Sequence, residues 1–163
     1  MIQAAVLTIS DSVSEGKRTD RSGPAVRDRL EQLGWQVAVL DVVPDDQARI
    51  ADRLTTLAAS GEASVIFTTG GTGVAARDVT PEATRAVIDR EIPGLGELMR
   101  SRGRASTPLA VLSRGLAGIR GRCLIVNLPG SPKGAVESLD AVIEVLPHAV
   151  DLLESRNLNH GAE

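Results

Sequence analysis

The chain has 163 residues, the length of one ordinary domain that buries roughly two thirds of the surface its unfolded form exposes. Hydrophobic residues make up 42% and charged residues 24%, a mix typical of a soluble globular protein, and the net charge of -3 argues against nucleic acid or an anionic membrane as a partner. Aromatic residues make up 1%, only Trp35 and Phe67, which excludes the stacking platforms of proteins that bind RNA and single strands. The sequence lacks both a membrane-spanning run and a signal-peptide pattern, so we expect a cytoplasmic protein.

The first half of the chain alternates strand and helix patterns. The apolar runs Ala4 to Ser10 and Ala63 to Thr69 are typical of buried parallel strands, whereas Trp35 to Val43 alternates more and is expected nearer an edge. Helical spacing covers Pro24 to Leu33 and Gln47 to Ser60. This order predicts an α/β fold of three layers, doubly wound, with a mostly parallel sheet covered by helices on both faces.

The second half mixes both patterns. We expect a short helix near Gly96 to Ser101, followed by a small antiparallel strand pair formed by Gly115 to Ile119 and Arg122 to Asn127. Helical spacing returns between Val136 and Leu146.

Two features limit the architectures that the chain can adopt. No repeat, low-complexity tract or linker interrupts the sequence, so we expect one domain over residues 1–155 and a loose tail over residues 156–163. Cys123 lies in the apolar run "CLIVNLP" without a second thiol, which excludes a disulfide framework and a cysteine-based metal site. We expect a buried and inert thiol.

A glycine-rich segment, "TTGGTGVAARDVTPEAT", follows the second of the buried strands. Its glycines formally match the dinucleotide fingerprint G-x-G-x-x-G/A, but in that motif the helix begins within the glycines. Here the better helix start is Thr80, as N-cap, with Pro81 at the first helical position. A P-loop sequence is absent. The segment therefore predicts a loop of bare backbone N–H groups beside one carboxylate, Asp78.

A carboxylate beside an anion-binding loop needs a mediator between the two negative charges. A divalent cation, Mg2+ by preference, can bridge Asp78 to phosphate oxygens and neutralise charge during phosphoryl or nucleotidyl transfer. The alternative is a structural glycine turn in which Asp78 only caps a backbone amide.

Polar loops also follow the other strands: "SDSVSEGKRTDRSGP", "VPDDQA" and "NLPGSPKG". Ligands of open parallel sheets bind beyond the carboxyl ends of the strands, so we expect these loops and the glycine-rich loop to converge on one crevice. Asp45 and Asp46 reach this edge, and Asp46 is expected to cap the helix that begins near Gln47. Arg77 and Lys133 are predicted to flank the crevice, because their loops also carry the phosphate-binding backbone.

Six motifs follow one another along the chain: "SDS", "VPDD", "TTGGTG…RDVTPEAT", "PGLGELMR", "LSRGLAGIRG" and "LIVNLPGSPKG". In order and spacing the chain resembles the MogA/MoaB family of molybdenum cofactor biosynthesis proteins, the molybdopterin adenylyltransferases, from about Leu7 to Leu153. The resemblance implies a nucleotidyltransferase that moves AMP from MgATP to the phosphate of molybdopterin and releases pyrophosphate. It also implies the doubly wound fold and a homotrimer or hexamer.

The resemblance further implies roles for individual residues. Asp78 and Asp45 match the two acids that the family ties to catalysis, and Asp78 is the metal ligand that the loop itself predicts. Val74-Ala75-Ala76 departs from relatives, which often have Gly, Pro or another Arg there. The other matching residues are expected to bind nucleotide or pterin: Ser10, Asp11, Gly70, Gly71, Thr72, Gly73, Asn127, Pro129, Gly130 and Ser131.

Arginines gather between Arg100 and Arg122, where the local charge opposes the net charge of the chain. Because Arg is enriched at interfaces and the chain has few large apolar anchors, we predict that this segment forms the interface of a homo-oligomer. The alternative is that the segment faces solvent and binds the anionic pterin or a partner.

Other functions stay open on the sequence alone. One is a non-catalytic molybdopterin-binding oligomer of the same pathway. Another is the related domain that accompanies nicotinamide-nucleotide amidases, whose loop usually contains "TGGLGPT". A third is a dinucleotide-dependent oxidoreductase, against which the late helix start argues.

Overall fold

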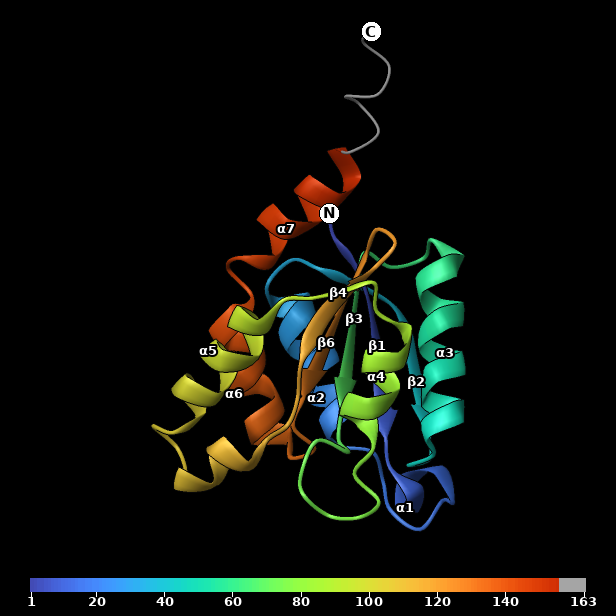
Figure 1. Ribbon diagram of the computed structural model, residues 1–163, viewed down its shortest axis with the longest axis vertical. Coiled ribbons are helices and arrows are strands. Elements are labelled where there is room, and N and C mark those ends of the chain that lie inside the picture. Colours follow the sequence, from blue (N-terminus) through green and yellow to red (C-terminus); the bar gives the residue numbers. More distant parts are fainter. Residues whose placement is uncertain (156–163) are drawn as a thin grey trace, which may run out of the picture.

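The computed structural model describes residues 1–155 and contains one six-stranded sheet between two layers of helices (Figure 1). The predicted tail, residues 156–163, lies outside the described residues. The strand order is β2-β1-β3-β6-β5-β4. The strands are β1 (Gln3–Ile9), β2 (Gln36–Val43), β3 (Val65–Thr69), β4 (Arg90–Glu91), β5 (Ala117–Arg120) and β6 (Cys123–Leu128).

The parallel part of the sheet consists of β2, β1, β3 and β6. Val6 of β1 pairs with Phe67 of β3, which pairs with Val126 of β6, so the central strands are aligned. Their side chains are buried on both faces, and this explains why their sequences are apolar without alternation. β2 lies at the edge and alternates in burial, as its sequence predicted.

An antiparallel pair extends the other edge of the sheet. β5 pairs with β6 through a tight turn at Gly121, whose φ is +60°, so the predicted strand pair is confirmed. β6 therefore belongs to both parts of the sheet. β4 pairs antiparallel with β5 and was not predicted, because the two residues Arg90–Glu91 are too few to give a periodic pattern.

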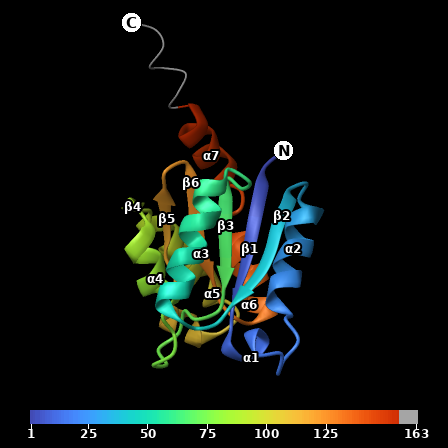
Figure 2. The same ribbon diagram turned by 90° about the vertical axis from the view of Figure 1, so that its right-hand side faces the viewer.

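Helices cover both faces of the sheet and confirm the three-layer α/β prediction (Figure 2). One face packs against α3 (Gln47–Ser60) and α4 (Thr80–Val87). The other face packs against α2 (Ser22–Gln32), α5 (Pro93–Gly103), α6 (Pro132–Val142) and α7 (Leu146–Ser155). Two short helices, α1 (Asp11–Ser14) and the 3-10 helix η1 (Pro108–Leu112), lie in connections between these elements.

Several helix boundaries differ from the predictions. The expected helix from Val136 to Leu146 is two helices, because α6 ends at Val142 and α7 begins at Leu146, with Pro147 in its first turn. The loop after β1 is shorter than expected, since it contains α1. The predicted cap of α4 is wrong: Val79 is the N-cap, and Thr80 is already helical.

Aliphatic side chains build the core, as the shortage of aromatic residues requires. Phe67 is fully buried, and its ring centroid lies 6.0 Å from that of Trp35. Cys123 is buried, as expected, and burial raises the pKa of its thiol to about 12, which disfavours the reactive thiolate.

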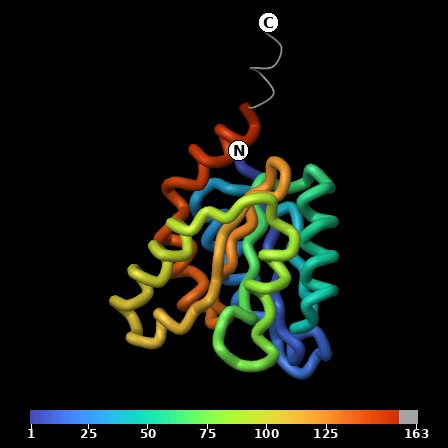
Figure 3. Tube along the Cα trace, in the orientation of Figure 1, coloured from blue at the N-terminus to red at the C-terminus, as the bar shows by residue number. Residues whose placement is uncertain are grey.

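The chain places its polar loops together at one end of the sheet. Figure 3 shows the segments that follow β1 (blue) and β3 (green) gathered at the lower end, beyond the carboxyl ends of the parallel strands. Within residues 1–155, no helix combines the length and the apolar character needed to cross a membrane.

Candidate functional site

The glycine-rich loop between β3 and α4 begins with two glycines in the left-handed region. Gly70 has φ +96°, and a Cβ on it would lie 2.4 Å from the carbonyl oxygen of Ile9. Gly71 has φ +67°, and a Cβ there would lie 2.2 Å from Oγ1 of Thr80. A side chain at either position is excluded by both conformation and space, so the first turn of the loop requires glycine.

Thr80 fixes the other end of this turn. Its hydroxyl donates to the carbonyl oxygen of Gly70 at 2.9 Å, and its backbone N–H donates to that of Gly71 at 3.1 Å. The side chain is fully buried. Thr80 therefore does not cap α4 but hydrogen-bonds the start of the helix to the glycines. Helix-capping patterns in the sequence do not reveal this role.

Asp78 lies at the end of the loop and lines a pocket. Its Oδ2 accepts a hydrogen bond from the backbone N–H of Ala75 at 3.0 Å, so it does cap an amide, as the structural alternative proposed. A Cβ on Gly73 would lie 2.8 Å from the same oxygen, so Gly73 gives the carboxylate its space. Among the described residues, none donates a hydrogen bond to the other carboxylate oxygen, which leaves it for a ligand.

Asp45 and Asp11 form a reciprocal pair on the other side of Gly71. The backbone N–H of Asp11 donates to Oδ2 of Asp45 at 2.9 Å, and that of Asp45 donates to Oδ1 of Asp11 at 3.0 Å. Arg77 donates from two nitrogens to the Asp11 carboxylate, at 2.9 Å each. Through this contact the glycine-rich loop is joined to the loop after β1.

Burial is the main cause of a raised pKa at Asp45. The charges of Asp11 and Asp78 raise it further, whereas the hydrogen bond from Asp11 and the charge of Arg77 lower it. Asp78 therefore lies close enough to influence Asp45, and the edge of the sheet carries a concentration of negative charge.

A pocket of about 490 Å³ opens beside the glycine-rich loop, a volume typical of sites for organic ligands. It is lined by the predicted residues Gly71, Thr72, Gly73, Asp78, Asn127, Pro129, Gly130 and Ser131. The predicted residues that do not line it are Ser10, Asp11, Asp45, Gly70, Arg77 and Lys133. The pocket thus accounts for part of the expected crevice, and the Asp11–Asp45 pair lies outside its lining but next to Gly71.

Three predicted ligand contacts are engaged elsewhere in the fold. Asn127 is 1% exposed, and both donors of its amide are used by the hydroxyls of Thr68 and Thr84, at 3.1 and 3.0 Å. Ser10 caps α1 by accepting from Val13 N–H at 3.3 Å. Lys133 is exposed and lies 3.9 Å from Glu137.

Sequence reasoning missed one wall of the pocket. Its residues on α5 and η1 include Met99, Arg100, Leu109 and Leu112, and α6 adds Glu137. The signal available for them was the apolar run "PLAVL", in which Leu109 remains 67% exposed and Leu112 49% exposed. An exposed apolar run beside polar loops is unusual enough to indicate a ligand wall.

The side chains at this site can hold a cation only if a bound ligand supplies the rest of the cation's coordination shell. Among residues 1–155, no group of three His, Cys, Asp or Glu side chains could hold a metal. Mg2+ commonly takes one or two carboxylates and completes its shell with water and phosphate oxygens, so the open oxygen of Asp78 suits it. Asp46, as predicted, caps α3 by accepting from Arg49 N–H at 3.0 Å and is not available.

The fold and the geometry together define a class of protein. It is an open α/β protein whose glycine-rich, acid-containing loop lies at the carboxyl edge of a parallel sheet, beside a pocket for an organic ligand.

Comparison with known proteins identifies the family. The model of the probable molybdopterin binding domain matches residues 5–148, and the chain belongs to this family. The molybdopterin adenylyltransferase of Helicobacter pylori is 42% identical over 154 residues, which cover 93% of this chain and 88% of that protein. The Escherichia coli enzyme of the same name is 38% identical over 167 residues, covering 94% and 86%.

A solved structure of a related protein has the same fold. The crystal structure of the molybdopterin biosynthesis enzyme MoaB from Thermus thermophilus superposes with a TM-score of 0.88 at 52% identity, covering 94% of this chain and 96% of that one. The family resemblance indicated by the motifs is confirmed.

Replacing Gly73 with alanine is expected to weaken ATP binding. The added methyl group would lie 2.8 Å from Oδ2 of Asp78 and would displace the carboxylate. We expect Gly73→Ala to raise the dissociation constant for ATP with Mg2+ at least about tenfold by calorimetry, equivalent to about 1.4 kcal/mol. Gly94→Ala is the control, since a Cβ there has no neighbour within 4 Å. Equal affinities in the two variants would leave the loop with a structural role only.

Asp45→Asn is expected to alter stability in a pH-dependent way. The folded pKa lies above the ordinary value of 3.8, so ionisation of Asp45 opposes folding. Relative to wild type, the variant should gain free energy of unfolding as pH rises from below 3.8 through the folded pKa, and should keep the gain at neutral pH. Urea unfolding across this range measures it.

The matched control is Asp46→Asn, which exchanges one good helix cap for another and should stay within about 0.5 kcal/mol of wild type at neutral pH. Parallel pH profiles for wild type and Asp45→Asn would contradict the assignment of burial as the dominant influence on Asp45.

Proposed function

We propose that this chain is a molybdopterin adenylyltransferase, which transfers AMP from ATP to the terminal phosphate of molybdopterin. The observation that carries the proposal is a bare backbone loop and an open carboxylate, Asp78, at the edge of a pocket of about 490 Å³. Phosphates suit the backbone N–H groups, and an organic ring system suits the apolar wall. The names of the related proteins support the same reaction.

The proposed step needs little from a general base. An oxygen of the molybdopterin phosphate is already anionic, attacks the α-phosphorus of ATP and forms a new P–O–P bridge. The bond between the α-phosphorus and its bridging oxygen to the β-phosphate breaks, and pyrophosphate leaves with that electron pair. The protein therefore acts by orienting two highly charged substrates and by compensating their charge.

Individual residues are proposed to share this task. Backbone N–H groups of Thr72 and Gly73, and that of Lys133 in the first turn of α6, bind phosphate oxygens. Asp78 would hold Mg2+, and Asp45 would support this site from the other side of Gly71. Bound Mg2+ would supply neutralisation of the negative charge on the phosphates. Arg77 is proposed to bind phosphate by leaving Asp11, because its side chain is 68% exposed.

The main alternative is a family member that binds molybdopterin without catalysis. The position of Asp45 beside Gly71 and of Asp78 beside Gly73 supports the enzyme, because both proposed catalytic acids then lie at the same loop. A dinucleotide-dependent oxidoreductase is disfavoured, since α4 begins at Thr80, well after the glycines. Because the reaction consumes ATP, we propose the cytoplasm as its location.

Asp78→Asn tests the reaction directly. The amide oxygen can still accept from Ala75 N–H, so the loop keeps this bond while the charge is lost. With molybdopterin, ATP and Mg2+, we expect turnover to adenylylated pterin to fall at least about a hundredfold, in line with the loss of one electrostatic group, with little change in Tm. Asp52→Asn, on the exposed face of α3, is the control. A wild-type chain that binds the pterin but forms no adenylylated product would favour the non-catalytic alternative.

We also propose that the chain is a homo-oligomer, a trimer or a hexamer, with the arginine-rich segment at its interface. The structure narrows this prediction, because three of these arginines bind carbonyl oxygens of their own chain: Arg100 to Gly115, Arg114 to Gly73 and Arg120 to Val87. The exposed members that remain for an interface are Arg102, Arg104 and Arg122.

Charge reversal of Arg102, Arg104 and Arg122 together should lower the mass measured by light scattering at micromolar concentration. Reversal of Arg18, Arg21 and Arg49, which changes the net charge equally, should leave the mass unchanged. A wild-type monomer, or equal behaviour of the two triple variants, would contradict this interface.

A further inference from the structure

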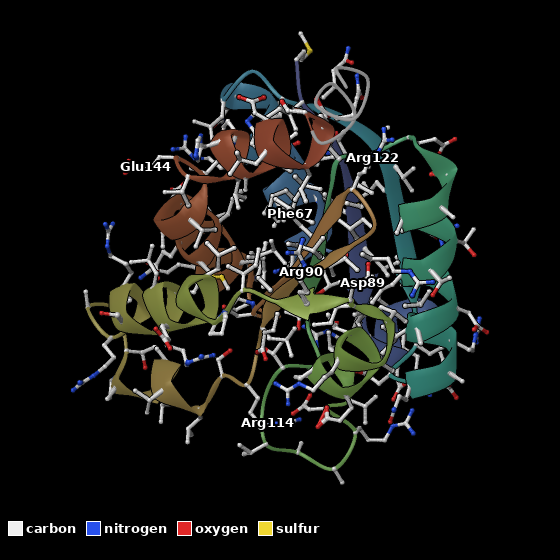
Figure 4. The ribbon with its side chains drawn as sticks, turned by 45° about the horizontal axis from the view of Figure 1, so that its top comes forward. Phe67, Asp89, Arg90, Arg114, Arg122 and Glu144 are labelled. Atoms are coloured by element: carbon white, nitrogen blue, oxygen red, sulfur yellow. The ribbon has the colours of Figure 1, made fainter. Side chains whose placement is uncertain are left out.

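Arg114 has a set of contacts that the proposed chemistry does not yet use. It lies between η1 and β5, and Figure 4 places its side chain beside the glycine-rich loop. Its Nε donates to the carbonyl oxygen of Gly73 at 2.7 Å, and its Nη2 donates to that of Asp78 at 2.7 Å. Its Nη1 pairs with the carboxylate of Glu82 on α4. One guanidinium group therefore binds the loop at two points and the following helix at a third.

The backbone of Arg114 adds a fourth connection, because its N–H donates to the carbonyl oxygen of Thr72 at 2.7 Å. Residues 74–77 between the two bound carbonyls are exposed, and their internal bonds are confined to Ala75 and Asp78. A chain this exposed keeps a fixed shape only if contacts from outside hold it. Arg77 supplies such a contact through Asp11, and Arg114 supplies the contacts at the two ends. The planar guanidinium presents its donors in a rigid fork, so it sets the separation of the Gly73 and Asp78 carbonyls.

The same segment forms part of the opposite wall of the pocket. Ser113 and Gly115, the neighbours of Arg114, both line the pocket, and the carbonyl oxygen of Gly115 accepts from Arg100 of α5 at 2.8 Å. Arg114 therefore connects the wall formed by α5 and η1 to the loop that carries Asp78.

We propose that Arg114 is a positioning residue, which holds the Asp78 carboxylate at the edge of the pocket by clamping both ends of the loop. It acts through Asp78, because its Nε, Nη2 and Nη1 each donate a hydrogen bond, to Gly73, Asp78 and Glu82 in turn. The inference rests on the proposed function for its effect on turnover. Its effect on loop order is independent of that function.

The test compares variants that remove different parts of the clamp. Arg114→Lys keeps the charge but cannot reach all three acceptors, and Arg114→Ala removes the group. Glu82→Gln weakens one contact and leaves both loop carbonyls bound. Arg85→Lys is the matched control, because Arg85 lies on the same helix but pairs with Glu91, away from the loop.

We expect kcat for adenylyl transfer to fall about a hundredfold in Arg114→Lys, as misplacement of a reacting group by about 1 Å can cause. KM for ATP should rise by a smaller factor, about the tenfold expected for Gly73→Ala, because both changes displace the Asp78 carboxylate. Glu82→Gln should stay within a few-fold, and Arg85→Lys should match wild type. Guanidinium added at millimolar concentration should restore part of the activity of Arg114→Ala and none to Asp78→Asn. A merely structural role would lower Tm and kcat together and would show no rescue.

Amide hydrogen exchange supplies a readout that needs no turnover. Faster exchange at residues 72–78 of Arg114→Lys, with unchanged exchange in β1 and β3, supports the clamp. Wild-type exchange rates in that loop overturn it, whatever the activity. An inactive wild type together with loosened loops in the Arg114 variants would instead remove the proposed function and keep the positioning role.

Discussion

Close contact between bare backbone segments is the constraint on which the site depends. At Gly70 and Gly71 the chain leaves β3 in the left-handed region, directly against the carbonyl oxygen of Ile9 and the hydroxyl of Thr80. This approach turns the chain across the edge of the sheet while leaving its N–H groups uncovered. Thr80 and Arg114 then hold the two ends of the loop by hydrogen bonds. Hydrogen bonds to backbone carbonyl groups hold the loop in place. The apolar side chains nearby line the pocket, so they do not pack against the loop.

The charge of the site follows from the same arrangement. Asp11, Asp45 and Asp78 share one edge of the sheet, and Arg77 pairs with only one of them. Burial together with these neighbours raises the pKa of Asp45. Such an edge repels polyphosphates unless backbone dipoles and a cation compensate. A loop of N–H groups with one open carboxylate that can hold a cation meets this requirement. A P-loop meets it with a lysine.

Sequence patterns predicted what depends on local order and burial. The doubly wound sheet, the edge position of β2, the β5–β6 pair and the Asp46 cap all follow from periodicity or from contacts within a few residues. What sequence could not predict depends on long-range contacts. Thr80 bonds to Gly70 instead of capping α4, and Asn127 uses its amide inside the fold. Arg114 reaches the loop from about forty residues away. A motif or a periodic run of residues does not show which distant residue it will contact. The wall formed by α5 and η1 was missed because the apolar run "PLAVL" is recognisable as a wall only once the fold leaves Leu109 and Leu112 exposed.

We propose that nucleotide phosphates bind where the glycine-rich loop meets the start of α6. The most direct measurement follows backbone amide signals of isotope-labelled protein by NMR while ATP and Mg2+ are added. We predict that the largest shifts occur at residues 71–78 and 131–134, and that Asp78→Asn reduces them in both segments. Largest shifts at Gly34, Gly61 and Gly121, which lie in turns at the other end of the sheet, would contradict it.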